Sequence, residues 1–284
     1  MATLSTPADP LDPTDGDVGS LDDVALLERL CDAARPIALR YFRGDLGVEN
    51  KRAEEGGFDP VTLADRAIEA RLRDLLKLGR PEDGVLGEEF GRVDGPSGRL
   101  WVLDPIDGTR NFMSGLLNWG VLIALHDGAQ PILGALDQPY TAERFLGDMR
   151  PGAGAARLTR GDHRAPLRTR PCPALEHATL CTTDPNLFSD GPQRAAFDRV
   201  AARARLTRLG TDCYGYAMVA AGQVDLVVEA GLSAYDIQAL IPLVRAAGGV
   251  VTNWRGGDPS WGGDVLAAGD ATLHAAAMAV LNDA

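Results

Sequence analysis

The chain has 284 residues, of which 45% are hydrophobic, enough to bury a substantial core in one large domain or two closely packed ones. Lysine and arginine number 28 against 40 aspartate and glutamate residues, which gives a net charge of −12. This acidic balance argues against nucleic acid or an anionic membrane surface as a partner, and no run of about 18 apolar residues could span a bilayer.

The cysteines and the first residues indicate the compartment. Cys31, Cys172, Cys181 and Cys213 form no C-x-x-C pair and are not spaced as zinc ligands. Isolated thiols are typical of a reducing compartment, so we expect a cytoplasmic protein. Residues 1–20 are acidic and rich in proline and glycine, without the features of a signal peptide, and are expected to form a disordered tail.

Residues 21–160 are expected to form an N-terminal α+β half that binds metal. An apolar stripe from Val24 to Ile37 predicts a first helix, and a second helix is expected to follow Thr62 as its N-cap. Strand-like runs occur at residues 85–86, 100–103, 121–125, 132–135 and 144–146. The last three predict an antiparallel meander, and residues 152–173, rich in glycine, arginine and proline, are the candidate junction between two halves.

Residues 161–284 have a different rhythm, in which strands alternate with helices. Strands are expected at residues 178–182, 206–209, 224–228, 250–254 and 265–268, and helices at residues 193–204, 213–221, 235–247 and 272–281. This alternation favours a C-terminal α/β half with a mostly parallel sheet, which would complete the site. Pro242 is awkward within the third of these helices, because it would release the Gln238 carbonyl.

The most informative motif follows the strand at residues 100–103, where Asp104-Pro105-Ile106-Asp107-Gly108-Thr109 places two aspartates in a tight turn. Proline fixes φ after Asp104, and glycine permits the turn after Asp107. Both carboxylates and the Ile106 carbonyl can then face one locus, and such oxygen ligands suit Mg²⁺. Gly108 and Thr109 would start a short helix whose N–H groups can bind phosphate. The alternative is that both aspartates are only turn and N-cap residues.

Other acids are candidates for the same locus, and each has a simpler explanation. Glu88 follows a short strand and a glycine, which suits a metal ligand but also a solvated loop acid, and Glu89 cannot be distinguished from it. Asp65 could instead be a capping-box acid that reaches back to Thr62. Asp236 could be a first-turn acid favoured by the helix dipole.

Together these motifs resemble the inositol monophosphatase superfamily of lithium-sensitive, magnesium-dependent sugar phosphatases. The matching segments are Asp59-Pro60-Val61-Thr62-x-x-Asp65, Gly87-Glu88-Glu89, Asp104-Pro105-Ile106-Asp107-Gly108-Thr109-x-Asn111-Phe112, Tyr235-Asp236-x-x-Ala239 and Ala246-Ala247-Gly248-Gly249. The resemblance covers residue 21 to the C-terminus and implies a layered α/β/α/β/α sandwich, usually dimeric. We therefore expect a homodimer.

The resemblance also implies how the site works. The implied metal ligands, for two or three Mg²⁺ ions, are Glu88, Asp104, the Ile106 carbonyl, Asp107 and Asp236. Asp65 and Thr109, together with Glu88, would activate the attacking water, and the Gly108 and Thr109 amides would hold the phosphate. Such metals neutralise a phosphate dianion and lower the pKa of water, which is what this hydrolysis needs.

The substrate prediction depends on two further acids. Inositol phosphatases usually have a small residue at the position of Asp212, and Glu229 matches the glutamate with which the family contacts substrate. Two carboxylates beside the leaving group, in addition to Asp107 and Asp236, favour a cationic alcohol, although Asp212 could instead be an N-cap. Arg110 is either a surface residue or touches phosphate or a neighbouring subunit.

Three segments resemble the histidinol-phosphatase branch of the superfamily: Gly210-x-Asp212-Cys213-Tyr214-x-Tyr216, Gly87-Glu88-Glu89-Phe90-Gly91 and Val224-Asp225-Leu226-Val227-Val228-Glu229. The expected reaction is hydrolysis of L-histidinol phosphate to L-histidinol in histidine biosynthesis. One alternative is a phosphatase for inositol 1-phosphate or another small metabolite. Another is a non-catalytic regulatory homologue, which the complete set of acids argues against.

Overall fold

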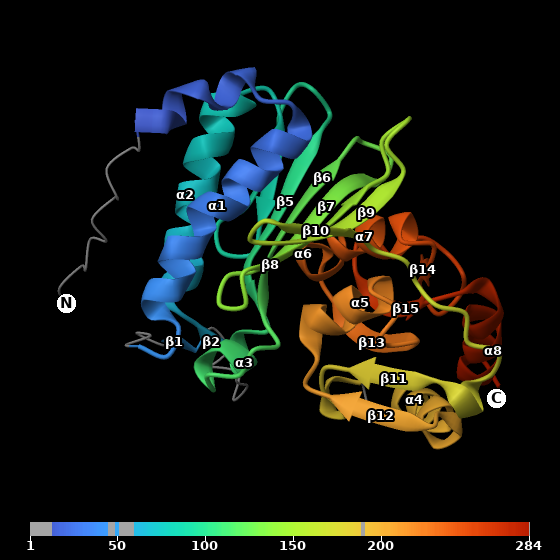
Figure 1. Ribbon diagram of the computed structural model, residues 1–284. Helices are drawn as coiled ribbons and strands as arrows, with labels where there is room; N and C mark the ends of the chain where they lie inside the picture. The colour runs from blue at the N-terminus through green and yellow to red at the C-terminus, as the bar shows by residue number, and fades with distance from the viewer. Residues whose placement is uncertain (1–12, 45–48, 51–59, 189–190, 284) are drawn as a thin grey trace.

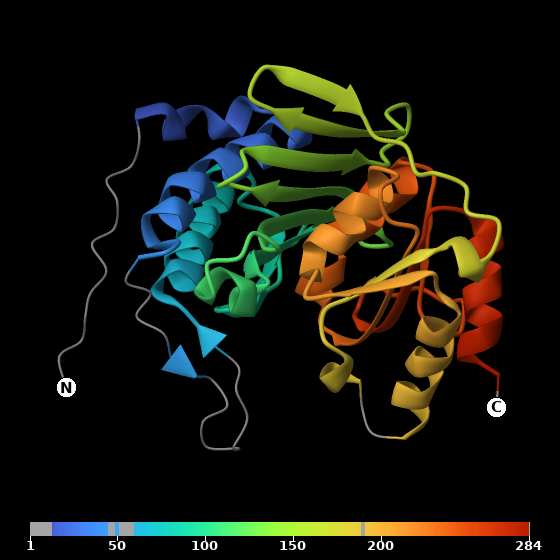
Figure 2. The ribbon, with the colours of Figure 1, turned by 60° about the horizontal axis from the view of Figure 1, so that its bottom comes forward.

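The computed structural model describes residues 13–44, 49–50, 60–188 and 191–283 and contains two halves, each built on one sheet (Figure 1). Helices cover the two outer faces, and a further layer of helices lies between the sheets (Figure 2). This is the layered α/β/α/β/α sandwich that the resemblance implied, so the predicted fold is confirmed. Among the described ranges, no helix has both the length and the hydrophobicity that a membrane crossing requires.

The N-terminal half contains an 8-stranded sheet in the order β10-β9-β8-β7-β6-β5-β3-β4. Its strands are β3 (Gly84–Gly87), β4 (Gly91–Val93), β5 (Leu100–Asp107), β6 (Gly120–His126), β7 (Pro131–Gln138), β8 (Glu143–Asp148), β9 (Ala155–Arg160) and β10 (His163–Pro166). The predicted antiparallel meander is present from β6 to β8. β3 and β5 pair in parallel, which brings the ends of both strands to the same edge.

Two long helices cover the outer face of this sheet, α1 (Asp23–Tyr41) and α2 (Leu63–Gly79). Alternate residues of a strand point to opposite faces, and β5 shows the consequence. Trp101 and Leu103 pack in the core with α1 and α2, whereas Leu100 and Val102 pack in the core between the sheets. A separate pair of two-residue strands, β1 (Glu49–Asn50) and β2 (Pro60–Val61), lies beside the short helix α3 (Thr109–Met113) (Figure 1).

Two predictions about the N-terminal half are corrected. A disordered tail over residues 1–20 is wrong for Pro13–Ser20, which form the 3-10 helix η1, because Val18 is buried against α2 and anchors it. Residues 1–12 lie outside the described residues. The boundary at residue 160 is also too early, because β9 and β10 form an edge hairpin of the first sheet. The connection between the halves therefore begins after Pro166.

The C-terminal half contains a 5-stranded sheet in the order β12-β11-β13-β15-β14. Its strands are β11 (Thr179–Thr182), β12 (Leu206–Leu209), β13 (Leu226–Leu232), β14 (Val250–Thr252) and β15 (Gly263–Ala268). The parallel arrangement expected here holds for β12, β11 and β13. The exception that a mostly parallel sheet allows is β15, which runs antiparallel to β13 and β14 because no crossover helix separates it from β14.

The helices of this half are α4 (Pro192–Arg203), α5 (Asp212–Ala220), α6 (Ala234–Ile237), α7 (Leu240–Ala246) and α8 (Ala271–Leu281), with short 3-10 turns η3 (Leu175–His177) and η4 (Pro185–Leu187). The continuous helix expected at residues 235–247 is thus divided into α6 and α7. Pro242 lies in the first turn of α7, where a backbone N–H has no intrahelical partner in any case. The break therefore explains how the proline is accommodated.

Candidate active site

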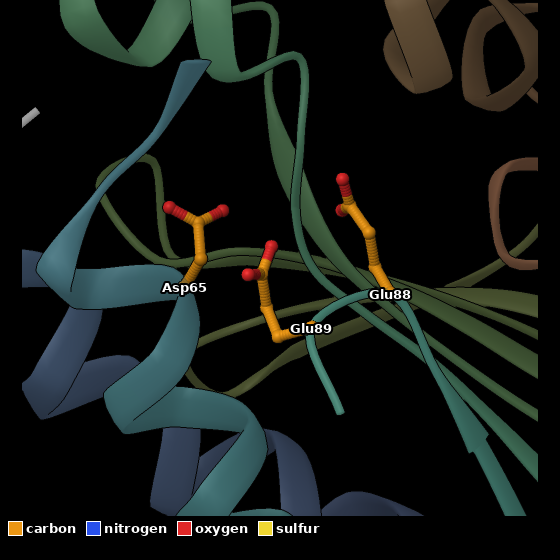
Figure 3. A group of neighbouring side chains, drawn as sticks. All are labelled: Asp65, Glu88 and Glu89. Atoms are coloured by element: carbon orange, nitrogen blue, oxygen red, sulfur yellow. The ribbon is translucent and has the colours of Figure 1, made fainter. Parts of the chain in front are cut away.

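Acids from four separate elements meet at the seam between the two halves. Ligand oxygens of Asp104, Asp107 and Asp236 lie within 4.8 Å of one another. A second group, Asp65, Glu88 and Glu89, satisfies the same distance criterion. Figure 3 shows these three side chains extending to the same side from α2 and from the turn after β3. The sequence placed these acids far apart, and the fold brings them together.

β5 runs through Asp107 rather than ending at residue 103, and its pairing is irregular between Asp104 and Asp107, where the two carboxylates are brought together. The Ile106 N–H donates to Asp104 Oδ1 at 3.1 Å, and Gly108 adopts a left-handed φ of 83°. Thr109 begins α3, and its hydroxyl donates to the Ile106 carbonyl at 3.0 Å. A carbonyl oxygen has two lone pairs, so this bond leaves one for a metal ion.

Asp107 is not a capping residue, since Gly108 occupies the N-cap position of α3. Its Oδ2 instead accepts the N–H of Cys213 at 2.8 Å, from the start of α5 in the other half of the molecule. Asp104, in contrast, accepts the N–H of Ile106, which is the bond expected of an aspartate that serves as a turn residue. The turn is therefore held from both halves, with its two carboxylates in one cluster.

The capping box expected for Asp65 is present, and Asp236 lies in the first turn of α6 as expected, where it also forms a capping box with Ser233. Asp65 Oδ2 accepts the N–H of Thr62 at 2.8 Å and its hydroxyl at 2.6 Å, and Asp236 Oδ2 accepts the N–H of Ser233 at 2.6 Å. Each carboxylate has a second oxygen, so a capping bond is compatible with a bond to metal. The matched motif also includes Asp59, which lies outside the described residues.

The charges of the acids act on one another. Burial raises the pKa of Asp104 well above its ordinary value, and the negative charges of Glu88, Asp107, Asp236 and Asp65 raise it further. Burial also raises the pKa of Asp65 to about 6. The negative charge of Glu89 adds to this increase, whereas the hydrogen bonds from Thr62 lower the pKa. The charge of Glu88 thus acts on Asp104 and that of Glu89 on Asp65, while ligand oxygens of both glutamates lie within 4.8 Å of those of Asp65.

The donor set fits a hard divalent cation. Crowding buried carboxylates is costly in the absence of a compensating charge. Burial raises the pKa of Asp236 and of Asp107 as well, so like charge is concentrated on one locus. Carboxylate and carbonyl oxygens are the ligands that Mg²⁺ prefers, and the residues expected to bind it supply these groups.

The two acids predicted to select the substrate lie beside this cluster. Asp212 is the first residue of α5, with Thr211 at the N-cap, so the N-cap explanation for Asp212 is wrong. Its carboxylate accepts the side-chain amide of Asn111. Burial raises the pKa of Asp212 to about 8, and the charges of Asp107 and Glu229 contribute to the shift.

Glu229 lies in the middle of β13 with 1% of its surface exposed. Its Oε1 accepts the N–H of Thr183 at 2.7 Å and its hydroxyl at 3.0 Å, and Thr182 donates to Oε2 at 3.2 Å. Burial nevertheless raises the pKa of Glu229 to about 7. Arg110 is half-exposed, 3.6 Å from Asp184, and its positive charge opposes the pKa shift of Asp212.

Several residues that shape the site were not predicted. Asn111 belongs to the matched motif, but its amide also donates to the carbonyls of Asn118 and Gly210 and so joins the two halves. Thr182 and Thr183 hold Glu229 from β11, a contact that sequence spacing cannot reveal. Glu69 lies one helical turn after Asp65, and this i, i+4 spacing was a usable signal.

Comparison with known proteins agrees with this geometry. The bifunctional phosphatase IMPL2 (chloroplastic) of Arabidopsis thaliana is 37% identical over 260 residues, which cover 88% of this chain and 72% of that protein. The histidinol-phosphatase of Mycobacterium tuberculosis is 34% identical over 264 residues, covering 93% of this chain and 99% of that one.

A solved inositol monophosphatase from Zymomonas mobilis is 36% identical, with a TM-score of 0.79 and coverage of 96% of this chain and 100% of that chain. The model of the inositol monophosphatase family matches residues 21–284, which include both acid groups and both halves of the fold. The chain is therefore a phosphatase that belongs to the inositol monophosphatase family.

Proposed function

We propose that this phosphatase hydrolyses L-histidinol phosphate to L-histidinol and phosphate, in a reaction that depends on Mg²⁺. The observation that carries the proposal is a pair of acids, the partly exposed Asp212 and the buried Glu229, whose pKa values are both raised by the charge of Asp107. Histidinol carries an ammonium group and an imidazole that titrates near neutral pH. A cationic leaving alcohol would compensate these two carboxylates, whereas a neutral polyol would not.

The proposed metal ligands are Glu88, Asp104, the Ile106 carbonyl, Asp107 and Asp236. Magnesium bound there would neutralise the phosphate dianion and act as a Lewis acid on its oxygens. The Gly108 and Thr109 amides would orient the phosphate, while Asp65, with Thr109 and Glu88, would take a proton from the attacking water. The new bond forms between water oxygen and phosphorus, the ester P–O bond breaks, and the leaving oxygen is protonated to give the alcohol.

A substrate panel with and without Mg²⁺ tests the proposal. Phosphate release is measured with histidinol phosphate, inositol 1-phosphate, fructose 1,6-bisphosphate and 3′-phosphoadenosine 5′-phosphate. We expect histidinol phosphate to have the highest kcat/KM and turnover to require Mg²⁺. A tenfold preference corresponds to only about 1.4 kcal/mol, so the preference must exceed that to decide between substrates.

Inositol 1-phosphate is the second candidate, because an inositol monophosphatase has a similar fold at 36% identity. A preference for that ester by clearly more than tenfold would replace the first proposal. A non-catalytic role is the third candidate, and it is opposed by the complete and convergent set of acids. The homodimer and the cytoplasmic location stay predictions.

A further inference from the structure

Glu69 is an acid of α2 that takes no part in the proposed reaction. Its side chain is fully buried. Its carboxylate accepts two consecutive backbone N–H groups from the turn after β3. Glu89 donates to Oε2 at 2.7 Å, and Phe90 donates to Oε1 at 3.1 Å. This turn carries Glu88 and Glu89, whose ligand oxygens lie within 4.8 Å of those of Asp65.

The charge of Glu69 is balanced on its other side by Arg73. The Arg73 Nε donates to Glu69 Oε1 at 2.7 Å, and the same guanidinium donates to the carbonyl of Gly91, where the turn ends. Glu69 and Arg73 are one helical turn apart, so both project from the same face of α2. The pair therefore holds the turn at its middle and at its end.

The close contact also explains the glycine that precedes the two acids. A Cβ added at Gly87 would lie 2.0 Å from Glu69 Oε1 and 2.3 Å from its carboxyl carbon. No other residue type fits there unless the Glu69 side chain moves. The Glu69 carboxylate thus packs directly against the backbone at Gly87, just before the turn.

Asp65 lies one turn before Glu69 on the same helix face, and its ligand oxygens lie within 4.8 Å of those of Glu88 and Glu89. α2 consequently supplies Asp65 to the cluster, as Figure 3 shows, and a second acid, Glu69, that holds the backbone of the opposing turn. A rigid helix sets the spacing between the two.

We propose that Glu69 is a positioning residue that fixes the Glu88–Glu89 turn in the geometry that binds Mg²⁺. The inference rests on the proposed magnesium-dependent function, and it concerns a residue that does not itself touch metal or substrate. Backbone hydrogen bonds to a carboxylate are among the stronger ones in proteins, because the acceptor is charged. Loss of the acceptor lets the turn relax and misplaces both acids.

The test compares Glu69→Gln with Asp225→Asn as a matched control. Asp225 is also buried and also accepts hydrogen bonds from an arginine and a backbone N–H, but it precedes β13 and belongs to neither acid group of the site. Both variants lose a buried, charge-assisted acceptor, so both should lose stability in urea unfolding. Only Glu69→Gln should bind Mg²⁺ more weakly, with a dissociation constant about 10- to 100-fold higher by calorimetry.

Manganese bound in place of magnesium gives a second readout, because its electron paramagnetic resonance spectrum reports ligand geometry directly. We expect an altered spectrum for Glu69→Gln and an unchanged one for Asp225→Asn. Equal Mg²⁺ binding by the unsubstituted protein and Glu69→Gln would overturn the inference while leaving the proposed function intact. Absence of Mg²⁺ binding by the unsubstituted protein would overturn both.

Gly87→Ala covers the case in which Glu69→Gln does not fold. This variant keeps the acid and forces its carboxylate away from the turn, since the new methyl group would lie 2.0 Å from Oε1. It should weaken Mg²⁺ binding in the same direction. Unchanged binding by folded Gly87→Ala would count against the inference.

Discussion

Asp104 is the residue at which function and stability are most directly opposed. Its carboxylate is buried, and the charges of Glu88, Asp107 and Asp236 raise its pKa. In the absence of a bound cation, burying this carboxylate therefore lowers the stability of the folded chain. Such a cost is typical of sites that are built for binding rather than for folding.

Asp104→Asn should separate the two effects. Replacement by an amide removes a shared metal ligand, and kcat should fall by about 100-fold or more, because metal stabilisation is worth several kcal/mol. The same change relieves repulsion, so in the presence of a chelator the free energy of unfolding should rise by about 0.5–2 kcal/mol. Phosphate release and urea denaturation are the measurements. A variant that keeps its activity would contradict the proposed Mg²⁺-dependent mechanism.

The substrate prediction is also made at the scale of single residues. In Asp212→Asn and Glu229→Gln, the KM for histidinol phosphate should rise about 10- to 100-fold, since a hydrogen bond to a charged group contributes about 1.5–3 kcal/mol. The KM for inositol 1-phosphate should change much less. Its alcohol is a neutral polyol, so the substitution removes no ion pair with the substrate. Equal losses with both esters would refute the cationic pocket.

At the scale of elements, the first strand of the C-terminal sheet is fixed to its neighbour by Asp225. This buried acid accepts two hydrogen bonds from Arg170, at 2.6 and 2.8 Å, and the N–H of Thr179 at 2.8 Å. Burial alone would raise its pKa, but these bonds outweigh burial and hold the pKa below the ordinary value. The contact ties the connection between the halves to the starts of β11 and β13.

The pH dependence of this contact has a definite sign. The pKa of Asp225 is lower in the folded chain than the value of about 3.9 in the unfolded chain, so its contribution is present at neutral pH. The contribution is lost as the pH falls through the folded-state pKa. Asp225→Asn should therefore cost about 1.5–3 kcal/mol at pH 7. The difference from the unsubstituted protein should shrink below about pH 4 in urea unfolding, and a constant difference would be inconsistent with this assignment.

Elements that depend on local signals could be predicted from the sequence, and those that depend on packing could not. Thr62 caps α2 as expected, because a cap needs only its own neighbours in the chain. The antiparallel direction of β15 and the edge hairpin of β9 and β10 depend on contacts across a sheet. The polar residues of β9 and β10 also weaken the apolar pattern of that hairpin. The helix η1 is anchored by one buried side chain, Val18, which no periodicity can indicate.

The site shows the same division. The acids of the Asp104 turn could be assigned from spacing, because the turn itself brings them together. That the charge of Glu88 acts on Asp104 and that of Glu89 on Asp65 depends on the positions of α2 and β5, which only the fold supplies. Capping and metal binding were treated as alternatives for Asp65, whereas a carboxylate with two oxygens can do both.

For the whole molecule, the site depends on how the two sheets are held apart. α7 lies in the layer between them and packs on a row of small residues that crosses four strands of the first sheet. The row, in which each residue pairs with the next, is Ala124, Gly134, Gly147 and Ala156. A Cβ added at Gly134 would lie 2.1 Å from the Ala239 carbonyl oxygen, and one at Gly147 would lie 2.3 Å from the Leu243 backbone. The helix therefore rests with its backbone directly on the sheet.

This contact fixes the distance between acids that belong to different halves. Asp236 lies in α6, just before α7, whereas Asp104 lies on β5 of the sheet that α7 contacts. Any lift of α7 from the glycine row should carry Asp236 away from Asp104. The packing of the two halves therefore determines the geometry of the proposed metal site.

Gly147→Ala tests this coupling at a distance from every acid of the site. The added methyl group overlaps backbone rather than a flexible side chain, so the free energy of unfolding should fall by about 1–3 kcal/mol. Mg²⁺ binding measured by calorimetry should weaken as well, because Asp236 moves with the helix. Gly19→Ala is the control, since a Cβ there meets nothing within 4 Å, and it should change neither quantity. A Gly147→Ala protein that is destabilised but binds Mg²⁺ normally would mean that α6 can hold Asp236 in place independently of α7.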